Sequence, residues 1–295
     1  MRTVLTRLAL ALACCTAGAA CAALPATTQG YRFQIVTGDD SSVTRRIADD
    51  LYKRLVPTFA GFRTELAQRR RMVLVAIGPT ALRDAALRPC DCVVIAAFTS
   101  SQVWRDVMAQ VTPVRAAAMT AIYAEPAPAD QLALIALLYR RPARVAAIVT
   151  DPHFFATNLR GAADLYAFAE GDDINRLLNR IAQTEVLLAL PDNAVFNAEN
   201  IRNILLSTYR HKQAVIGFSS DMVRAGALAS TYSEIEDINV QVAETAAQFV
   251  ATGTLPAPQF PRYFQTVINE GVARSLDVTV DSAARSFARR PALKP

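Results

Sequence analysis

The sequence predicts an α/β protein of two lobes, each a doubly wound parallel sheet, joined by a hinge and separated by a cleft. The first observation is that apolar runs of strand length alternate with segments of helical periodicity along most of the chain. The second is that this alternation restarts near residue 120. The third is size, because 295 residues, of which 52% are hydrophobic and 19% charged, suffice for two domains with separate cores.

The first half of the chain is predicted to hold four strands with helices between them. Val43, Ile47, Leu51 and Leu55 recur at helical spacing, which predicts an amphipathic helix. Nearly continuous apolar runs are typical of parallel strands that are buried on both faces. The expected strands are 31–36, 72–77, 92–97 and 114–123, and the expected helices are 42–55, 81–87 and 100–110.

The second half repeats this alternation. A strongly apolar helix opens it, and short apolar strands then alternate with helices up to a long helix near the end. The expected strands are 145–150, 165–168, 185–190 and 214–218, and the expected helices are 128–139, a stretch from 154, 173–182, 198–209 and 235–251.

The order of the motifs indicates three crossings between the lobes, near residues 120, 232 and 262. The helix 235–251 should then pack on the first lobe. Parallel sheets of this kind bind ligands at the carboxyl ends of their strands, so two facing lobes make a cleft from those ends. The expected lobes are 23–119 with 233–261, and 120–232 with 262–290.

The N-terminus has the three parts of a secretory signal peptide. Arg2 and Arg7 give a basic start, a short apolar stretch follows, and residues 20–22 offer the small side chains that signal peptidase accepts. The apolar stretch is shorter than the about 20 residues that a membrane-spanning helix needs. We expect removal of residues 1–22 and export to the periplasm, and the alternative is a lipoprotein anchored through Cys21.

The charge balance argues against a nucleic-acid partner. Of the net charge of +5, two arginines belong to the first 22 residues, which leaves 29 basic and 26 acidic residues and a net charge of +3. A phosphate binder needs a clustered basic stripe. The one basic cluster, 69–71, follows a helical stretch and is interpreted as a solvated helix end, with a polyanion contact as the alternative.

Two cysteines, Cys90 and Cys92, remain after the expected cleavage. A disulfide across one intervening residue is expected to be strained, and two thiols with no nearby histidine do not make a zinc site. We therefore expect small apolar side chains at the start of a strand, with redox or soft-metal chemistry as the alternative.

The sequence contains no recognisable combination of catalytic residues. His153 and His211 are the only histidines, and they lie far apart without a Gly-x-Ser-x-Gly nucleophile motif. The Gly78-Pro79-Thr80 turn lacks the second glycine and the lysine of a phosphate-binding loop. The sequence therefore predicts neither an enzyme nor a cofactor nor a metal site, and a hydrolase is disfavoured.

Several motifs resemble one known family. They are QLAL at 131–134, RVAAI at 144–148, LALPDN at 188–193, VIGFSSD at 215–221, AGALAS at 225–230 and VIN at 267–269. In this order they resemble the periplasmic substrate-binding proteins of ABC transporters, in the branch that includes tryptophan- and tyrosine-type binders. The turn 38–41 is shorter than in the family, and the segment after Thr99 lacks its Asp-Pro loop.

The resemblance implies a type I periplasmic-binding-protein fold that captures a small solute by closing its lobes about a hinge. It also implies a monomer whose partner is an ABC permease. A second hypothesis is a degenerate relative that acts as a sensor, or as the partner of a membrane receptor, without transport.

Polar residues that follow the strands are the candidate ligand-binding residues. Free N–H groups at helix N-termini hold carboxylates, although each such residue could instead cap its own helix. The tyrosines fall near two crossings, where they could stack on a flat ligand or pack the hinge. We expect a small ligand with a carboxylate and a flat or apolar body. The candidates are Ser41, Thr80, Thr99, Ser100, Tyr123, Thr150, Asp151, Asp192, Asn193, Ser219, Ser220 and Tyr232.

Overall fold

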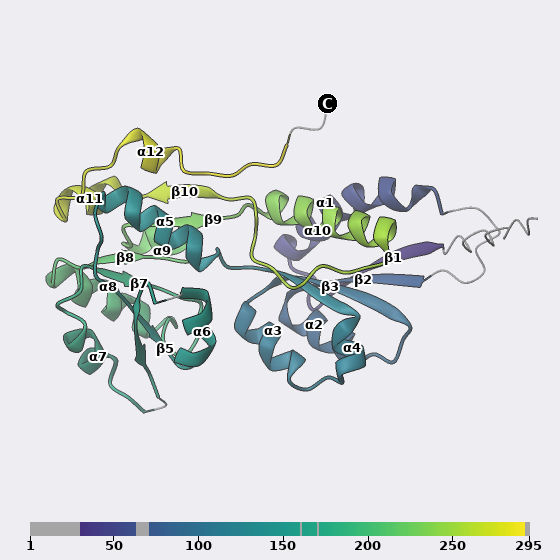
Figure 1. Ribbon diagram of the computed structural model, residues 1–295, viewed down its shortest axis with the longest axis horizontal. Coiled ribbons are helices and arrows are strands. Elements are labelled where there is room, and N and C mark those ends of the chain that lie inside the picture. Colours follow the sequence, from purple (N-terminus) through teal and green to yellow (C-terminus); the bar gives the residue numbers. More distant parts are fainter. Residues whose placement is uncertain (1–29, 63–70, 160, 170, 293–295) are drawn as a thin grey trace, which may run out of the picture.

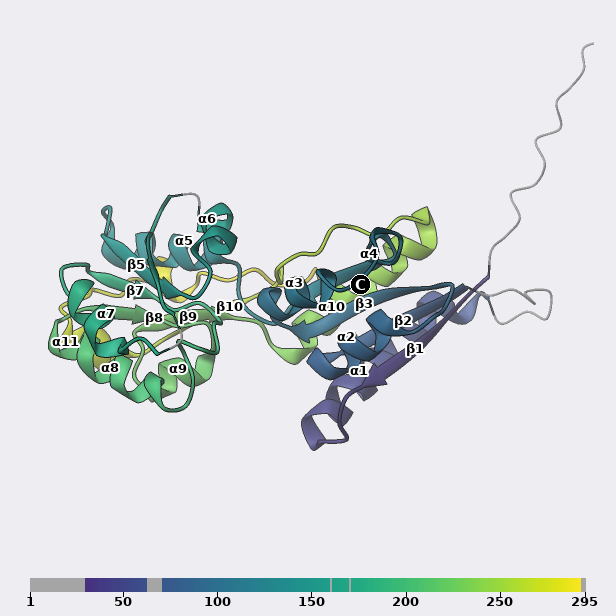
Figure 2. The same cartoon turned by 90° about the horizontal axis from the view of Figure 1, so that it is seen from below.

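The chain forms two α/β lobes that lie side by side (Figures 1 and 2). The computed structural model describes residues 30–62, 71–159, 161–169 and 171–292. The expected signal peptide, with Cys21, and the first two arginines of the basic cluster lie outside the described residues. No helix in the described part of the chain is long and apolar enough to cross a membrane.

The first lobe is built on a parallel four-stranded sheet in the order β1-β2-β3-β4. The strands are β1 Tyr31–Thr37, β2 Arg71–Ile77, β3 Cys92–Thr99 and β4 Met119–Tyr123. The helices are α1 Ser42–Ala60 and α10 Ile235–Thr252 on one face, and α2 Gly78–Leu87 and α3 Ser101–Met108 on the other (Figure 1). Helices on both faces explain why β2 and β3 read as continuous apolar runs.

One element of this lobe differs from the sequence prediction. The expected strand 114–123 is divided into a short helix, α4 Pro113–Ala117, and strand β4. Thr112 caps this helix by accepting a hydrogen bond from the Arg115 N–H at 3.3 Å, and Pro113 occupies its first turn, where a missing N–H is no loss.

The second lobe is built on a six-stranded sheet in the order β10-β9-β8-β7-β5-β6, parallel except for the β10–β9 pair. The strands are β5 Val145–Val149, β6 Asp164–Ala167, β7 Val186–Leu188, β8 Ala214–Ile216, β9 Ala229–Tyr232 and β10 Gln265–Ile268. The last two were not predicted as strands. The helices are α5 Pro128–Tyr139, α6 Pro152–Leu159, α7 Ile174–Arg180, α8 Asn200–Arg210, α9 Ser220–Ala225, α11 Glu270–Ser275 and α12 Ser282–Arg285.

The structure places α10 against the first lobe. Its Ile238, Val242 and Phe249 share a buried core with Leu51 and Leu55 of α1. The side chain of the fully buried Asn239 also donates hydrogen bonds to the Ile47 carbonyl at 3.1 Å and to Asp50 at 2.9 Å.

The chain passes between the lobes after β4, after β9 and before β10 (Figure 1). Strand β4 belongs entirely to the first sheet, so the first passage follows Tyr123. The third passage lies beside β4, because the Gln259 N–H donates to the Ala121 carbonyl at 2.9 Å and the Tyr123 N–H donates to the Gln259 carbonyl at 3.0 Å. Gln131 of α5 links the first two passages, since its amide contacts Ser230 and Thr231 of β9.

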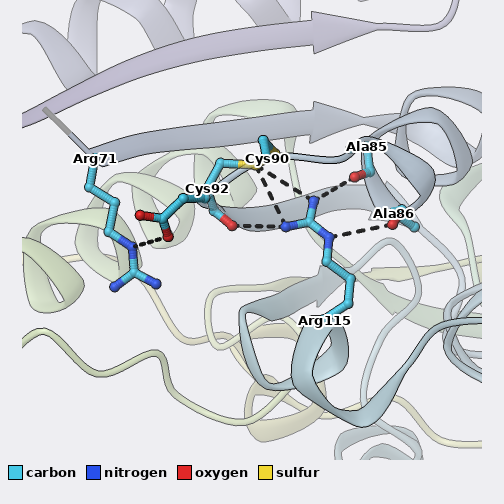
Figure 3. Close-up of a disulfide and its surroundings, with 7 residues drawn as sticks. Arg71, Ala85, Ala86, Cys90, Cys92 and Arg115 are labelled. Carbon is cyan, nitrogen blue, oxygen red and sulfur yellow. Dashed lines mark hydrogen bonds and ion pairs between the residues drawn. A yellow bond between two sulfur atoms is a disulfide. The ribbon is translucent and has the colours of Figure 1, made fainter. Parts of the chain in front are cut away.

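The structure joins Cys90 and Cys92 in a disulfide (Figure 3), which corrects the expectation of two separate thiols. The bend before β3 brings their Cα atoms to 5.2 Å, within reach of a disulfide. Beside it, the Arg115 guanidinium donates to the Ala85 carbonyl at 2.6 Å and to the Cys92 carbonyl at 2.9 Å. Arg115 thus connects the last turn of α2 to the start of β3.

Candidate functional site

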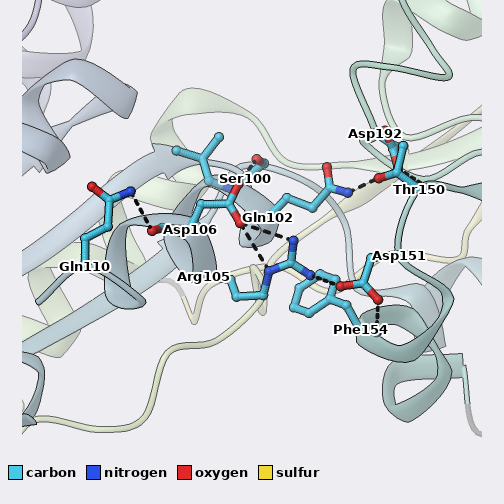
Figure 4. Close-up of polar contacts among 10 residues, drawn as sticks. Ser100, Gln102, Arg105, Asp106, Gln110, Thr150, Asp151, Phe154 and Asp192 are labelled. Atoms are coloured by element: carbon cyan, nitrogen blue, oxygen red, sulfur yellow. Dashed lines mark hydrogen bonds and ion pairs between the residues drawn. The ribbon is translucent and has the colours of Figure 1, made fainter. Parts of the chain in front are cut away.

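The lobes meet where α3 of the first lobe faces the loops after β5 and β7 of the second (Figure 4). The Gln102 amide donates to the Asp192 carboxylate at 3.2 Å. The Arg105 guanidinium pairs with Asp151 at 2.7 Å, and its carbon atom lies 4.4 Å from the centre of the Phe154 ring. The carboxyl ends of the two parallel sheets therefore face each other, as ligand-binding α/β folds require.

Asp192 is the most highly bonded side chain at this junction. It is 3% exposed, and it accepts hydrogen bonds from the Thr150 N–H and hydroxyl, both at 2.7 Å, besides the one from Gln102. Its other oxygen accepts from the Ala194 N–H at 3.2 Å. This carboxylate therefore connects two loops of the second lobe to α3 of the first.

Asp151 is more exposed and has a second contact. Its carboxylate accepts a hydrogen bond from the Phe154 N–H at 3.1 Å at the start of α6. That backbone hydrogen bond, with the charge of Arg105, lowers the pKa of Asp151 from its ordinary value. Asp151 is therefore a carboxylate at neutral pH and can hold the Arg105 guanidinium across the junction.

Strand β3 ends in an irregularity that shapes the site. The pairing of β3 with β4 shifts between Ala97 and Thr99, and Phe98 between them has a left-handed backbone with φ of 57°. A bulge of this kind bends a strand and redirects the residues that follow. Here the Thr99 carbonyl accepts from the Ala124 N–H at 3.0 Å, which brings the start of α3 beside the first hinge passage.

A small inter-lobe pocket lies between α3, the first hinge passage and the second lobe. Its volume is about 10 Å³, which is room for about one water molecule. A molecule larger than water can therefore occupy this space only when the lobes separate. The lining residues are Ser101, Glu125, Pro126, Pro128, Gln131, Phe155, Ala189, Leu190, Pro191, Phe218 and Phe260.

Glu125 is the titratable side chain among the residues that line this inter-lobe pocket. The side chain is 4% exposed, and one carboxylate oxygen accepts a hydrogen bond from the Ser101 N–H at 2.8 Å, at the N-terminus of α3. The other oxygen, Oε2, is buried and has no hydrogen-bond partner among the described residues. Burial raises the pKa of Glu125, against the hydrogen bonding from Ser101.

Three of the predicted serines cap their own helices. Ser41 accepts a hydrogen bond from Thr44 N–H at 3.2 Å, Ser100 from Val103 N–H at 3.2 Å, and Ser219 from Met222 N–H at 3.3 Å. In this structure the three side chains therefore act as N-caps of their own helices, which is the alternative role that the sequence left open for them.

The other predicted residues spread over the same end of the two sheets. Thr80 packs beside Gly38, where an added Cβ would lie 2.6 Å from it, and Thr99 is buried. Tyr123 stacks edge-on against Phe260 with ring centres 5.0 Å apart, and burial together with the charge of Glu125 raises the pKa of Tyr123 to about 12. Asn193 is exposed, whereas Ser220 and Tyr232 are partly buried.

None of the twelve predicted residues lines the inter-lobe pocket, although immediate neighbours of several do. The sequence prediction missed Glu125, which lies between the expected strand 114–123 and the next expected helix, and Gln131, which lies inside the apolar helix 128–139. A local signal was present for Gln131, because a glutamine inside a strongly apolar helix is unusual.

Comparison with known proteins gives structural matches only. No protein-family model matches the chain, and no curated protein matches it in sequence. A structure titled as an ABC domain with L-Trp from Streptococcus pneumoniae is 16% identical with a TM-score of 0.52, over 86% of this chain and 97% of that one. A ligand-free, open substrate-binding protein with adhesive properties from Clostridium difficile is 12% identical with a TM-score of 0.58, over 86% and 97%.

A third structure, a conserved domain protein from Vibrio cholerae, is 17% identical with a TM-score of 0.52, over 88% of this chain and 99% of that one. At such identities the likeness concerns the fold, and it extends over nearly the whole length of each neighbour. The chain therefore has the two-lobed α/β fold of the type I periplasmic binding proteins.

Proposed function

We propose that the protein is the solute-binding component of an ABC importer and that it captures a small ligand by closing its lobes. The observation that carries the proposal is the junction between the lobes, where Gln102 and Arg105 of one lobe contact Asp192 and Asp151 of the other. These contacts exist only when the lobes are together, so a ligand held between the lobes favours the same state.

The proposed ligand is a small molecule with a carboxylate and a flat or apolar body. Phe155, Phe218 and Phe260 line the inter-lobe pocket, and aromatic side chains suit a flat, apolar group. N-termini of several helices lie at the same end of the sheets, and their N–H groups suit a carboxylate. The neighbour from Streptococcus pneumoniae is titled as a complex with L-Trp, which has both features.

The predicted polar residues keep their proposed roles at the two walls of the cleft. The wall on the first lobe is formed by the N-termini of α1, α2 and α3. The wall on the second lobe is formed by the loops that follow β5, β7 and β8. Tyr123 and Tyr232 are proposed to bound the ligand near the hinge. The proposed compartment is the periplasm, reached through the signal peptide 1–22.

A sensor is the second candidate, because the same closure could be recognised by a membrane receptor instead of a permease. A permease gene and an ATPase gene beside the coding sequence would favour import, and their absence would favour sensing. In both cases the protein performs no chemistry on the solute.

A thermal-shift panel of amino acids, aromatic acids, sugars and metal ions tests the proposed ligand class. A ligand present at 100 times its dissociation constant stabilises the folded state by about 2.7 kcal/mol. We expect at least one carboxylate with an apolar body to raise the melting temperature. Stabilisation by sugars alone would contradict the ligand class, and no response to any solute would contradict solute capture.

A further inference from the structure

The N-terminus of α3 already holds a carboxylate from the chain itself. Glu125 fills the position at the Ser101 N–H where a carboxylate ligand was expected to bind. A second anion at the same helix end would be placed beside this buried charge, and like charges at close range repel strongly in a medium of low polarity.

The remaining carboxylate oxygen is the unusual atom. A buried polar group without a partner destabilises a folded protein, so nearly all such groups in proteins find a hydrogen bond. Glu125 Oε2 is buried, its residue lines the inter-lobe pocket, and the atom has no hydrogen-bond partner among the described residues. The neighbouring ionisable side chain at the end of β4 is Tyr123, and a tyrosine cannot supply the positive charge that would pair with Glu125.

The other side chains that line the inter-lobe pocket do not hydrogen-bond to this oxygen. Apart from Glu125, its polar side chains are Ser101 and Gln131, and the remaining lining residues are apolar. Gln131 is occupied, because its amide NH2 donates to the Gly217 carbonyl and its oxygen accepts from the Thr231 N–H. The Ser101 side chain acts on the same carboxyl group, yet Oε2 itself is left without a hydrogen-bond partner among the described residues, and a proton on Glu125 or a group from outside the chain can supply one.

We propose that Glu125 Oε2 binds a protonated amine of the ligand, so that the solute belongs to the class of aromatic or apolar amines, amino acids included. This inference rests on the proposed function and names the group that the pocket selects. The phenylalanine rings accept the apolar body, and the amine supplies the positive charge and the donor that Glu125 lacks. A charge-assisted hydrogen bond of this kind is about twice as strong as a neutral one.

Three matched probes share one aromatic body and test the proposal by calorimetric titration. L-Phenylalanine has an amine and a carboxylate, phenethylamine has only the amine, and 3-phenylpropionate has only the carboxylate. We expect the first two to bind and the third to bind at least about tenfold more weakly, the difference that one charged hydrogen bond makes.

The variant Glu125→Gln separates recognition from folding. The new amide oxygen can still accept from the Ser101 N–H, whereas its NH2 group meets a ligand amine donor to donor. We expect the melting temperature of the free protein to stay or rise, because a buried charge is removed, while the affinity for phenethylamine falls about tenfold or more. The control is Glu185→Gln, which lies before β7 at the opposite end of the sheet and should leave binding unchanged.

The proposal is overturned if 3-phenylpropionate binds as tightly as phenethylamine, if Glu125→Gln keeps the wild-type affinity, or if none of the three probes binds. The thermal-shift panel distinguishes these failures from failure of the proposed function. A response there to any other solute leaves capture between the lobes intact and removes only the amine assignment.

Discussion

At the scale of single residues, Asp192 connects more groups than any other side chain at the junction of the lobes. Replacing it with alanine removes its four hydrogen bonds and leaves the Thr150 N–H without its partner. We expect Asp192→Ala to lower the free energy of unfolding by about 2 kcal/mol, measured by urea denaturation, and to weaken binding of a confirmed ligand. The exposed neighbour supplies the control, since Asn193→Ala should change stability by less than about 0.5 kcal/mol. Equal losses for the two variants would contradict this role.

The same residues show what the sequence can and cannot predict about the site. Asp192 stands out because it follows a buried strand in a recognisable motif, but its hydrogen-bond partners Gln102 and Thr150 come from elements far apart in the chain. Glu125 was missed because its importance depends on burial and on the bulge at Phe98, and neither has a signature in one local stretch.

At the scale of elements, Arg115 shows how the short helix α4 connects helix α2 to strand β3. Its guanidinium donates to main-chain carbonyls of Ala85, Ala86 and Cys92, all in buried residues. We expect Arg115→Met to lower the free energy of unfolding by about 1–3 kcal/mol, because these buried acceptors lose their partner. Chemical denaturation measures it, and the control is Arg88→Met, an exposed change at the residue that follows helix α2. A similar small effect for both variants would exclude the structural role of Arg115.

Elements that are buried on both faces were predictable, and the exceptions have physical causes. The run 114–123 is apolar enough for a strand, but Thr112 and Pro113 begin a helix within it. Strand β9 reads Ala-Ser-Thr-Tyr and lacks an apolar pattern, yet Ser230 and Thr231 are fully buried, with Gln131 among their hydrogen-bond partners. A pairing between distant residues therefore decides an element that local sequence does not.

At the scale of the whole molecule, the Arg105–Asp151 ion pair affects how often the lobes are together. Both side chains are over a third exposed, so the pair contributes little to the stability of either lobe. We expect Arg105→Ala to raise the radius of gyration in small-angle X-ray scattering without ligand, while the melting temperature stays nearly constant. Arg224→Ala removes an exposed pair within the second lobe and should change neither quantity. An unchanged radius for Arg105→Ala would mean that other contacts hold the lobes together.

The hydrogen bonds between neighbouring hinge passages have a mechanical consequence. Gln259 fastens the third passage to β4, and Gln131 fastens the start of the second lobe to β9. The first contact holds the third passage to the first lobe, and the second contact lies within the second lobe, so only the short stretches between them are left to bend. We expect the relative motion of the lobes to be confined to these stretches. Because Pro126 and Phe260 in two of these passages also line the pocket, bending of the passages changes the width of the pocket directly.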